Sequence, residues 1–121
     1  MNLRAIVPVV AVTAGLLGPM VTGGPAYAEN GPSGCNHSVC LYTAYTGKGY
    51  QAWAEFRIGV TRGHHHITGP GLDRNTPDGP WRAGQDSRRY NARGSGQVCA
   101  EGWSYSGGGW HSIGLPCVTI G

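Results

Sequence analysis

Four side chains of this chain are suited to acid–base chemistry on a phosphate ester. Glu55 lies in the segment YQAWAEFRI, Arg57 and Arg62 are close to it, and His111 comes near the C-terminal end. A carboxylate can take the proton of an RNA 2′-hydroxyl, a histidine can protonate the leaving oxygen, and arginines can hold the phosphate. These residue types would support a ribonuclease-like reaction, provided that the fold brings them together.

A run of three consecutive histidines, which begins at His64, is the candidate metal-binding segment. On a strand, His64 and His66 share a face and could bind one ion together. A firm site needs a third and a fourth ligand, for which His37, His111 and Asp73 are only candidates. The alternative is a surface histidine run, because a His-rich tract is a compositional signal. No metal or other cofactor is predicted.

The sequence offers no activated nucleophile. No serine lies in a G-x-S-x-G elbow. The four cysteines are expected to be oxidised, so they cannot act as thiolates. The catalytic signals are therefore weak, and a non-enzymatic protein is favoured.

The aromatic residues favour binding instead. The chain has four tryptophans and six tyrosines but one phenylalanine, and such amphipathic rings supply much of the energy at protein interfaces. Some of them must also form the core of so small a domain. The predicted binding residues are Trp53, Trp81, Trp103, Tyr105 and Trp110.

Residues 50–58 alternate between apolar and polar, as a half-buried strand does. The apolar face is predicted to carry Tyr50, Ala52, Ala54, Phe56 and Ile58. Trp53 lies on the polar face, where it either covers a second sheet or presents an exposed ring to a ligand. As an exposed ring beside Gln51 and Glu55, it would suit a carbohydrate.

The first 28 residues have the composition of an export signal. Residues 5–20 are almost wholly apolar, Arg4 is the only charge before Glu29, and residues 26–28 (AYA) have the small-x-small form of a signal-peptidase site. Cleavage after Ala28 is expected to leave one domain, residues 29–121. That domain is predicted to be secreted and extracellular, with no membrane segment.

The four cysteines, Cys35, Cys40, Cys99 and Cys117, all lie in this expected domain. An even number in a short exported chain implies two disulfides. A metal site built from all four is the alternative, but the usual C-x2-C spacing is missing. The favoured pairing is Cys35–Cys40 with Cys99–Cys117, and the main alternative is Cys40–Cys99 with Cys35–Cys117.

The favoured pairing follows from the three glycines at 107–109. If the chain folds back at Gly108, Cys99 faces Cys117 and Tyr105 faces His111. A related pattern occurs at 39–50. In both segments V-C is followed, after four or five residues, by Tyr, then Ser or Thr, Gly, any residue, Gly and an aromatic residue. The sequence therefore predicts two related β-hairpins.

The remaining segments are rich in turn residues. Residues 29–34 are predicted to be a flexible leader. Residues 60–96 are predicted to be a long central loop with one short strand at 61–67, and the arginines in its second half are interpreted as solvated.

The hairpin pattern resembles that of the microbial βγ-crystallin-like small secreted proteins, a group that includes metalloproteinase inhibitors and toxin-like proteins. Tyr42 with residues 45–47 (YTG), and Trp103 with residues 105–107 (YSG), approximate the family's aromatic and aromatic-x-Gly motif. The resemblance covers the two hairpins and excludes residues 60–96. It implies a sandwich of two Greek-key motifs and assigns no reactive residue.

A second resemblance is to the small secreted microbial guanyl-specific ribonucleases. Segments 50–69 and 105–117 are similar to that family's central strands and C-terminal end. The resemblance implies Glu55 as the base and His111 as the acid. This chain has no candidate for the N-terminal helix of that family. It also has 35 residues between Gly69 and Tyr105, which is more than the family has between the corresponding segments.

We therefore expect a small all-β, disulfide-stabilised Greek-key sandwich or barrel-like sheet. The whole chain has a net charge of +3, and losing Arg4 with the leader leaves +2, which does not favour nucleic acid. The expected function is binding of an extracellular protein, either a protease to be inhibited or a subunit of a secreted assembly. The alternatives are a lectin-like module for carbohydrate or cell wall, and a small ribonuclease-like toxin.

Overall fold

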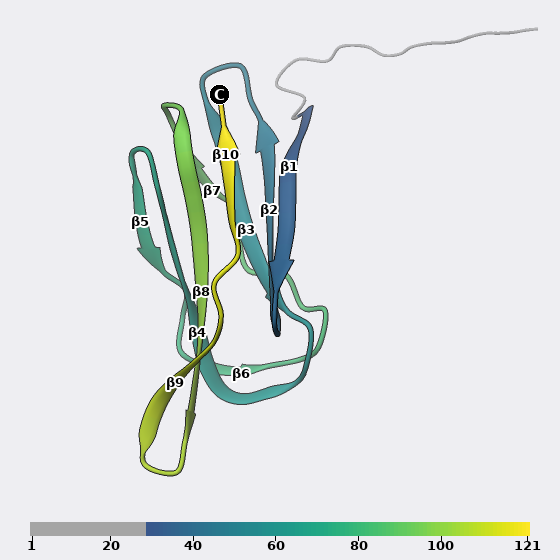
Figure 1. Ribbon diagram of the computed structural model, residues 1–121, viewed down its shortest axis with the longest axis vertical. Coiled ribbons are helices and arrows are strands. Elements are labelled where there is room, and N and C mark those ends of the chain that lie inside the picture. The colour runs from purple at the N-terminus through teal and green to yellow at the C-terminus, as the bar shows by residue number, and fades with distance from the viewer. Residues whose placement is uncertain (1–28) are drawn as a thin grey trace, which may run out of the picture.

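Residues 29–121, the part of the chain that the computed structural model describes, form ten strands in two antiparallel sheets (Figure 1). The first sheet has the order β1-β2-β3-β7 and consists of β1 (Glu29–Asn36), β2 (Val39–Tyr45), β3 (Tyr50–Phe56) and β7 (Tyr90–Ala92). The second sheet consists of β4 (Val60–Gly69), β5 (Leu72–Asn75), β6 (Gly79–Trp81), β8 (Gly96–Ser106), β9 (Gly109–Gly114) and β10 (Cys117–Ile120). The predicted all-β class is confirmed.

The predicted signal peptide, residues 1–28, and its cleavage site after Ala28 lie outside the described residues. Within residues 29–121 there is no helix of the length and apolarity needed to span a membrane.

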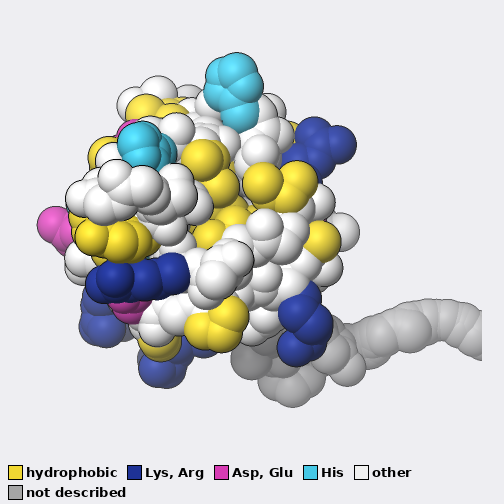
Figure 2. Space-filling model, turned by 90° about the horizontal axis from the view of Figure 1, so that it is seen from below, with side chains coloured by type: hydrophobic (Ala, Val, Ile, Leu, Met, Phe, Trp, Pro, Cys, Tyr) yellow, Lys and Arg dark blue, Asp and Glu magenta, His cyan; other side chains and the backbone are white. Residues whose placement is uncertain are grey.

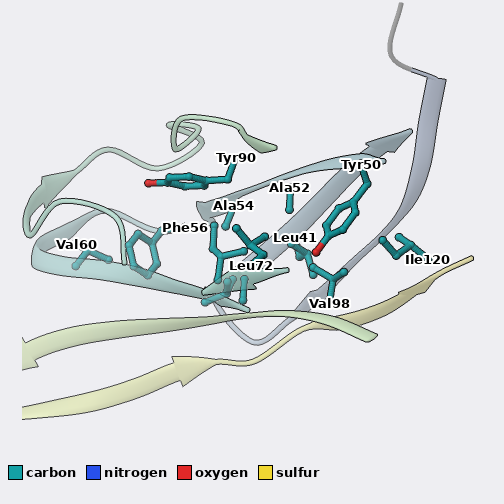
Figure 3. Close-up of a cluster of buried hydrophobic side chains, with 13 residues drawn as sticks. Leu41, Tyr50, Ala52, Ala54, Phe56, Val60, Leu72, Tyr90, Val98 and Ile120 are labelled. Atoms are coloured by element: carbon teal, nitrogen blue, oxygen red, sulfur yellow. The ribbon is translucent and has the colours of Figure 1, made fainter. Parts of the chain in front are cut away.

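Strand β3 shows how the alternating sequence builds the core. Tyr50, Ala52, Ala54 and Phe56 point inward and are almost completely buried. They meet side chains of the second sheet, including Val98 and Ile120, as Figure 3 shows. The prediction that Ile58 belongs to this face is wrong, because β3 ends at Phe56 and the Ile58 side chain is 50% exposed. The alternation therefore predicted the strand correctly but extended it too far.

Strands β4 and β8 form the centre of the second sheet. Their register runs from Gly63 opposite Ser104 to Thr68 opposite Cys99. Each has two shorter strands on its other edge: β5 and β6 pair with β4, while β9 and β10 pair with β8.

The prediction of a long central loop at 60–96 is wrong, although the short strand expected at 61–67 lies within β4. The segment contains four strands, and β4 is ten residues long. The inward face of β4 includes Gly63 and His65, so it lacks the run of apolar residues by which a buried strand is recognised. The Gly-Pro and Pro-Asp-Gly segments are connections between short strands of one sheet.

The predicted flexible leader at 29–34 is also an ordered strand. β1 pairs with β2 from Glu29 opposite Tyr45 to Asn36 opposite Val39, with an irregularity between Asn30 and Ser33. Pro32 lies in that irregularity, as expected for a proline on the edge of a sheet. Its carbonyl accepts a hydrogen bond from the Thr43 hydroxyl at 2.6 Å.

The two predicted hairpins are present, one in each sheet. Tyr45 lies opposite Tyr50, and Tyr105 lies opposite Trp110. The predicted pairing of Tyr105 with His111 is wrong, because the turn contains only Gly107 and Gly108. Both have positive φ angles, 58° and 82°, as a tight two-residue hairpin turn requires.

The two disulfides pair as favoured by the sequence, Cys35 with Cys40 and Cys99 with Cys117. Each joins residues that lie directly opposite one another on neighbouring antiparallel strands, β1 with β2 and β8 with β10. Both bonds therefore brace strand pairs within a sheet.

Candidate functional site

The outer face of the second sheet gathers the rings that the sequence marked for binding. Along β8, Val98, Ala100 and Gly102 are buried, so Trp103 and Tyr105 point away from the core. Trp103 lies opposite His64 of β4, and Tyr105 lies opposite Trp110 of β9. We call the set formed by Arg62, His64, Trp103, Tyr105 and Trp110 the aromatic face.

Three rings of the aromatic face, His64, Tyr105 and Trp110, pack edge to face. Trp110 lies with its ring centroid 5.1 Å from that of Tyr105, at an interplanar angle of 69°. Its centroid is 4.8 Å from that of His64, at 70°. Such geometry is favourable for aromatic pairs, and it holds Trp110 in place although its side chain is 40% exposed.

Arg62 ties these rings to the rest of the sheet. Its guanidinium carbon lies 4.4 Å from the ring centroid of Tyr105 and 5.3 Å from that of Trp110. Its Nε lies 3.1 Å from a carboxylate oxygen of Asp78, in the turn before β6. Cation–π contacts and the ion pair together fix the arginine over the rings.

The aromatic face extends onto the part of the molecule that projects furthest. Figure 1 shows the β8–β9 hairpin reaching beyond the other strands, at the end opposite the C-terminus. Seen from that end, Figure 2 shows exposed hydrophobic and histidine side chains together, with lysine and arginine side chains around the rim. The hairpin tip is therefore open to a large partner.

The histidines at 64 and 66 lie on one face, as predicted, but each has its own carboxylate. His64 Nδ1 lies 3.9 Å from Asp78 Oδ1, and His66 Nε2 lies 2.7 Å from Asp73 Oδ1. Within residues 29–121, no group of three or more His, Cys, Asp or Glu side chains is arranged to hold a metal ion. The two histidines are surface groups of the aromatic face and its border.

The histidine between them lies in the core. The side chain of His65 is fully buried, and neither ring nitrogen has a hydrogen-bond partner among residues 29–121. Its ring stacks on Phe56 with centroids 4.0 Å apart and meets Trp81 edge to face at 5.2 Å. Burial, with a smaller contribution from His64, lowers the pKa of His65 to about 4, so this ring is neutral at pH 7.

Two predicted binding residues lie elsewhere. Trp81 packs against Phe56 and the core, and its indole N–H donates to the carbonyl of Gly63 at 2.9 Å. Trp53 points outward from the first sheet but is only 9% exposed, because Arg89 lies 3.7 Å over its ring. The prediction of an exposed Trp53 for a sugar is therefore wrong.

The covering segment that hides Trp53 runs between β6 and β7. Its Ser87 amide donates to the carbonyl of Ala54 at 2.8 Å, and Asp86 forms a bridge with Glu55. This segment acts as a partial extra layer on the first sheet.

The residues considered for RNA cleavage are not brought together. Glu55 points outward from the first sheet, since its neighbours Ala54 and Phe56 are buried. His111 belongs to β9 of the second sheet, with its Nε2 3.1 Å from the Ser106 carbonyl. Arg62 is engaged with Tyr105 and Asp78.

Glu55 instead has a structural partner in Tyr42, whose hydroxyl donates to the carboxylate. This hydrogen bond is the main reason that the pKa of Tyr42 is raised to about 12; burial and the charges of Glu55 and Asp86 add to it. Because the pKa of the folded state is the higher one, the stabilisation is present below about pH 10 and is lost as the pH rises towards 12.

We expect Tyr42→Phe to lower the free energy of unfolding by about 1–2 kcal/mol at pH 7, since a charged acceptor loses its donor. Urea denaturation would measure this. The difference from the wild type should shrink between pH 10 and 12, and a constant difference would show that the hydrogen bond is not its source.

Sequence reasoning missed Asp78 and the true role of Arg62. Arg62 and His64 are two residues apart on a strand, which is the signal that places them on one face. Asp78 reaches them from a turn, and no local pattern indicates that contact. No protein-family model, curated protein or solved structure matches this chain.

Proposed function

We propose that this protein is a secreted, non-enzymatic binding module that docks a protein partner on its aromatic face. The observation that carries the proposal is the joining of Trp103, Tyr105 and Trp110 with Arg62 on one solvent-facing surface. Tryptophan, tyrosine and arginine are the residues enriched at the energetic centres of protein interfaces.

The packing of the rings favours a protein over a sugar. A sugar ring stacks on the open face of an aromatic ring, but Arg62 already lies over Tyr105 and approaches Trp110. Trp110 also stands edge-on to its two neighbours, so the set does not make a flat platform. The aromatic face is uneven and its Trp110 side chain is exposed, so it suits a pocket on the surface of a protein partner instead.

The charges near the aromatic face are of both signs. Asp78 forms an ion pair with Arg62, and Figure 2 shows lysine and arginine side chains around this end of the molecule. The proposal therefore rests on the rings and not on the sign of the charge. Two disulfides and no free cysteine in residues 29–121 are consistent with an extracellular location.

Capture from the secreted fraction of the producing cells tests the proposal, with the immobilised domain as bait. We expect a protein that is retained by the wild type and released when Trp110 is changed to alanine. Once the partner is identified, Trp110→Ala should weaken binding by about 30-fold or more, the loss typical of a central interface residue. Calorimetric titration would measure the Kd.

Ile58→Ala is the matched control, because Ile58 is also an exposed large apolar residue but lies off the aromatic face. It should bind as the wild type does. Equal loss in both variants, or unchanged binding by Trp110→Ala, would contradict docking on the aromatic face. Retention on neutral polysaccharide that depends on Trp110 would support the lectin-like alternative instead.

A further inference from the structure

Two adjoining hollows lie on the first sheet, away from the aromatic face. The larger, about 650 Å³, runs from the β2–β3 turn to the end of β7 and is lined by Thr46, Gly47, Lys48, Gln51, Asn91, Ala92 and Arg93. The smaller, about 210 Å³, lies between β7 and β5, where Arg74, Arg88 and Arg89 contribute to its wall. Asn91 lines both, so they form one continuous strip across β7.

The strip is strongly cationic. Five of the eight lysine and arginine side chains that follow residue 28 line it, and no aspartate or glutamate does. None of the five forms an ion pair with a carboxylate of residues 30–121, whereas Arg62 on the other sheet does. The positive charges of the strip are therefore not neutralised within the described part of the protein.

Three of these arginines are held in place by aromatic rings. The guanidinium of Arg89 lies 3.7 Å from the ring centroid of Trp53, and those of Arg74 and Arg88 lie 5.9 and 5.6 Å from that of Tyr90. Stacking restrains a guanidinium but leaves the N–H groups at its edge free to bind an anion. The rings thus preorganise donors for charge-assisted hydrogen bonds.

We propose that this strip binds an anionic polysaccharide, with the cations on its acidic groups and the polar side chains on its hydroxyls. Gln51 and Asn91 are joined by an amide hydrogen bond of 3.0 Å and retain further donors and acceptors for hydroxyl groups. A ligand with repeated charges matches two neighbouring hollows that each carry cations.

The lining argues against single-stranded nucleic acid. That ligand binds through base stacking on open rings, but Trp53 and Tyr90 are buried and have arginines over their faces. An acidic polypeptide is distinguished from a polysaccharide by the comparison with polyglutamate in the test.

Dextran sulfate is the probe, and uncharged dextran of the same length is its control. Calorimetric titration in 50 mM NaCl should detect binding of the sulfated polymer alone, and 500 mM NaCl should abolish it by screening. The double variants Lys48→Gln with Arg93→Gln, and Arg88→Gln with Arg89→Gln, should each bind about tenfold more weakly or worse, since each loses two charge-assisted contacts.

Arg57→Gln with Arg82→Gln is the matched control, since it removes the same charge from two exposed arginines outside the strip. It should stay within about twofold of the wild type. Equal weakening by this control, or no weakening by the Lys48 and Arg93 pair, would overturn the proposal. Tighter binding of polyglutamate or oligothymidylate than of dextran sulfate would overturn the assignment to polysaccharide.

Two checks separate this site from others. Thermal unfolding followed by circular dichroism should match that of the wild type for the Lys48 and Arg93 pair, which carries the decisive test. The Arg88 and Arg89 pair also removes the cover of Trp53, so its binding is compared at a temperature at which circular dichroism shows it to be folded. Trp110→Ala should bind dextran sulfate normally. Loss of dextran sulfate binding in Trp110→Ala would place the polysaccharide on the aromatic face and overturn the assignment to the strip.

Discussion

Replacing Phe56 by alanine should lower the free energy of unfolding by about 4 kcal/mol. The Phe56 side chain is completely buried between the sheets, stacks on His65, and meets Trp81 edge to face. Its removal loses the free energy of burying an apolar ring and leaves a cavity. The hydrogen-bonded strands of the two sheets cannot move together enough to fill that cavity. Small domains have only about 5–15 kcal/mol in total, so this variant should be close to unfolding at 37 °C.

Ile58→Ala is again the control, because the sequence pattern places it on the same face as Phe56 whereas the structure exposes it. It should change the unfolding free energy by less than about 0.5 kcal/mol. Urea denaturation of both variants would measure the contrast. Similar losses in the two would mean that β3 continues inward to Ile58 and that the observed end of the strand is incorrect.

Acidification should destabilise the protein through His65. An unfolded histidine has a pKa of about 6.5, whereas the pKa of His65 in the folded state is about 4. Between these values the unfolded chain binds a proton that the folded protein excludes, so the unfolding free energy falls as the pH falls. The full loss is about 3 kcal/mol, complete near pH 4 and absent above about pH 6.5.

Denaturation between pH 5 and 6.5 avoids most carboxylates, which titrate below that window, and comparison with His65→Leu separates His65 from the other four histidines. The slope due to His65 should be about 1.1 kcal/mol per pH unit in the middle of the window, and His65→Leu should remove it. His111→Gln, which changes an exposed histidine, should leave the slope unchanged. An unaltered slope in His65→Leu would assign the acid sensitivity to other groups.

The disulfide pairing could be predicted from sequence because two local errors cancel. The turn at Gly107 and Gly108 is one residue shorter than symmetry about Gly108 implies, which shifts the pairing of Tyr105. Ile113 then forms an extra residue in β9, between the partners of Trp103 and Gly102, and restores the expected register. Cys99 thus meets Cys117 as predicted, although the residues near the turn do not pair as predicted.

Strand β4 was predicted only in part, as a short strand at 61–67, because its buried face lacks the usual apolar residues. The inward position 63 holds glycine because a Cβ there would lie 2.3 Å from the Trp103 carbonyl oxygen on β8. The inward position 65 accepts a histidine because its ring stacks on Phe56. Both contacts are made with residues of other strands, so the sequence around β4 does not indicate them.

The aromatic face was predicted in part. Trp103 and Tyr105 are two residues apart in a strand and must share a face. The predicted pairing of Tyr105 with His111 put Trp110 on the other face, and the shorter turn brings it opposite Tyr105 instead. The same composition argument included Trp53 and Trp81, which are covered by Arg89 and by the core. Only tertiary packing separates an open ring from a covered one.

The placement of the disulfides has a consequence for how the molecule comes apart. Because each bond joins two strands of one sheet, neither resists separation of the two sheets. Each cross-link acts instead on the unfolded chain, whose freedom it restricts, and the Cys99–Cys117 bond closes the longer segment, 18 residues against 5. Reduction should therefore lower the stability of the protein to heat without removing a single contact between the two sheets, and most of that loss should come from the Cys99–Cys117 bond.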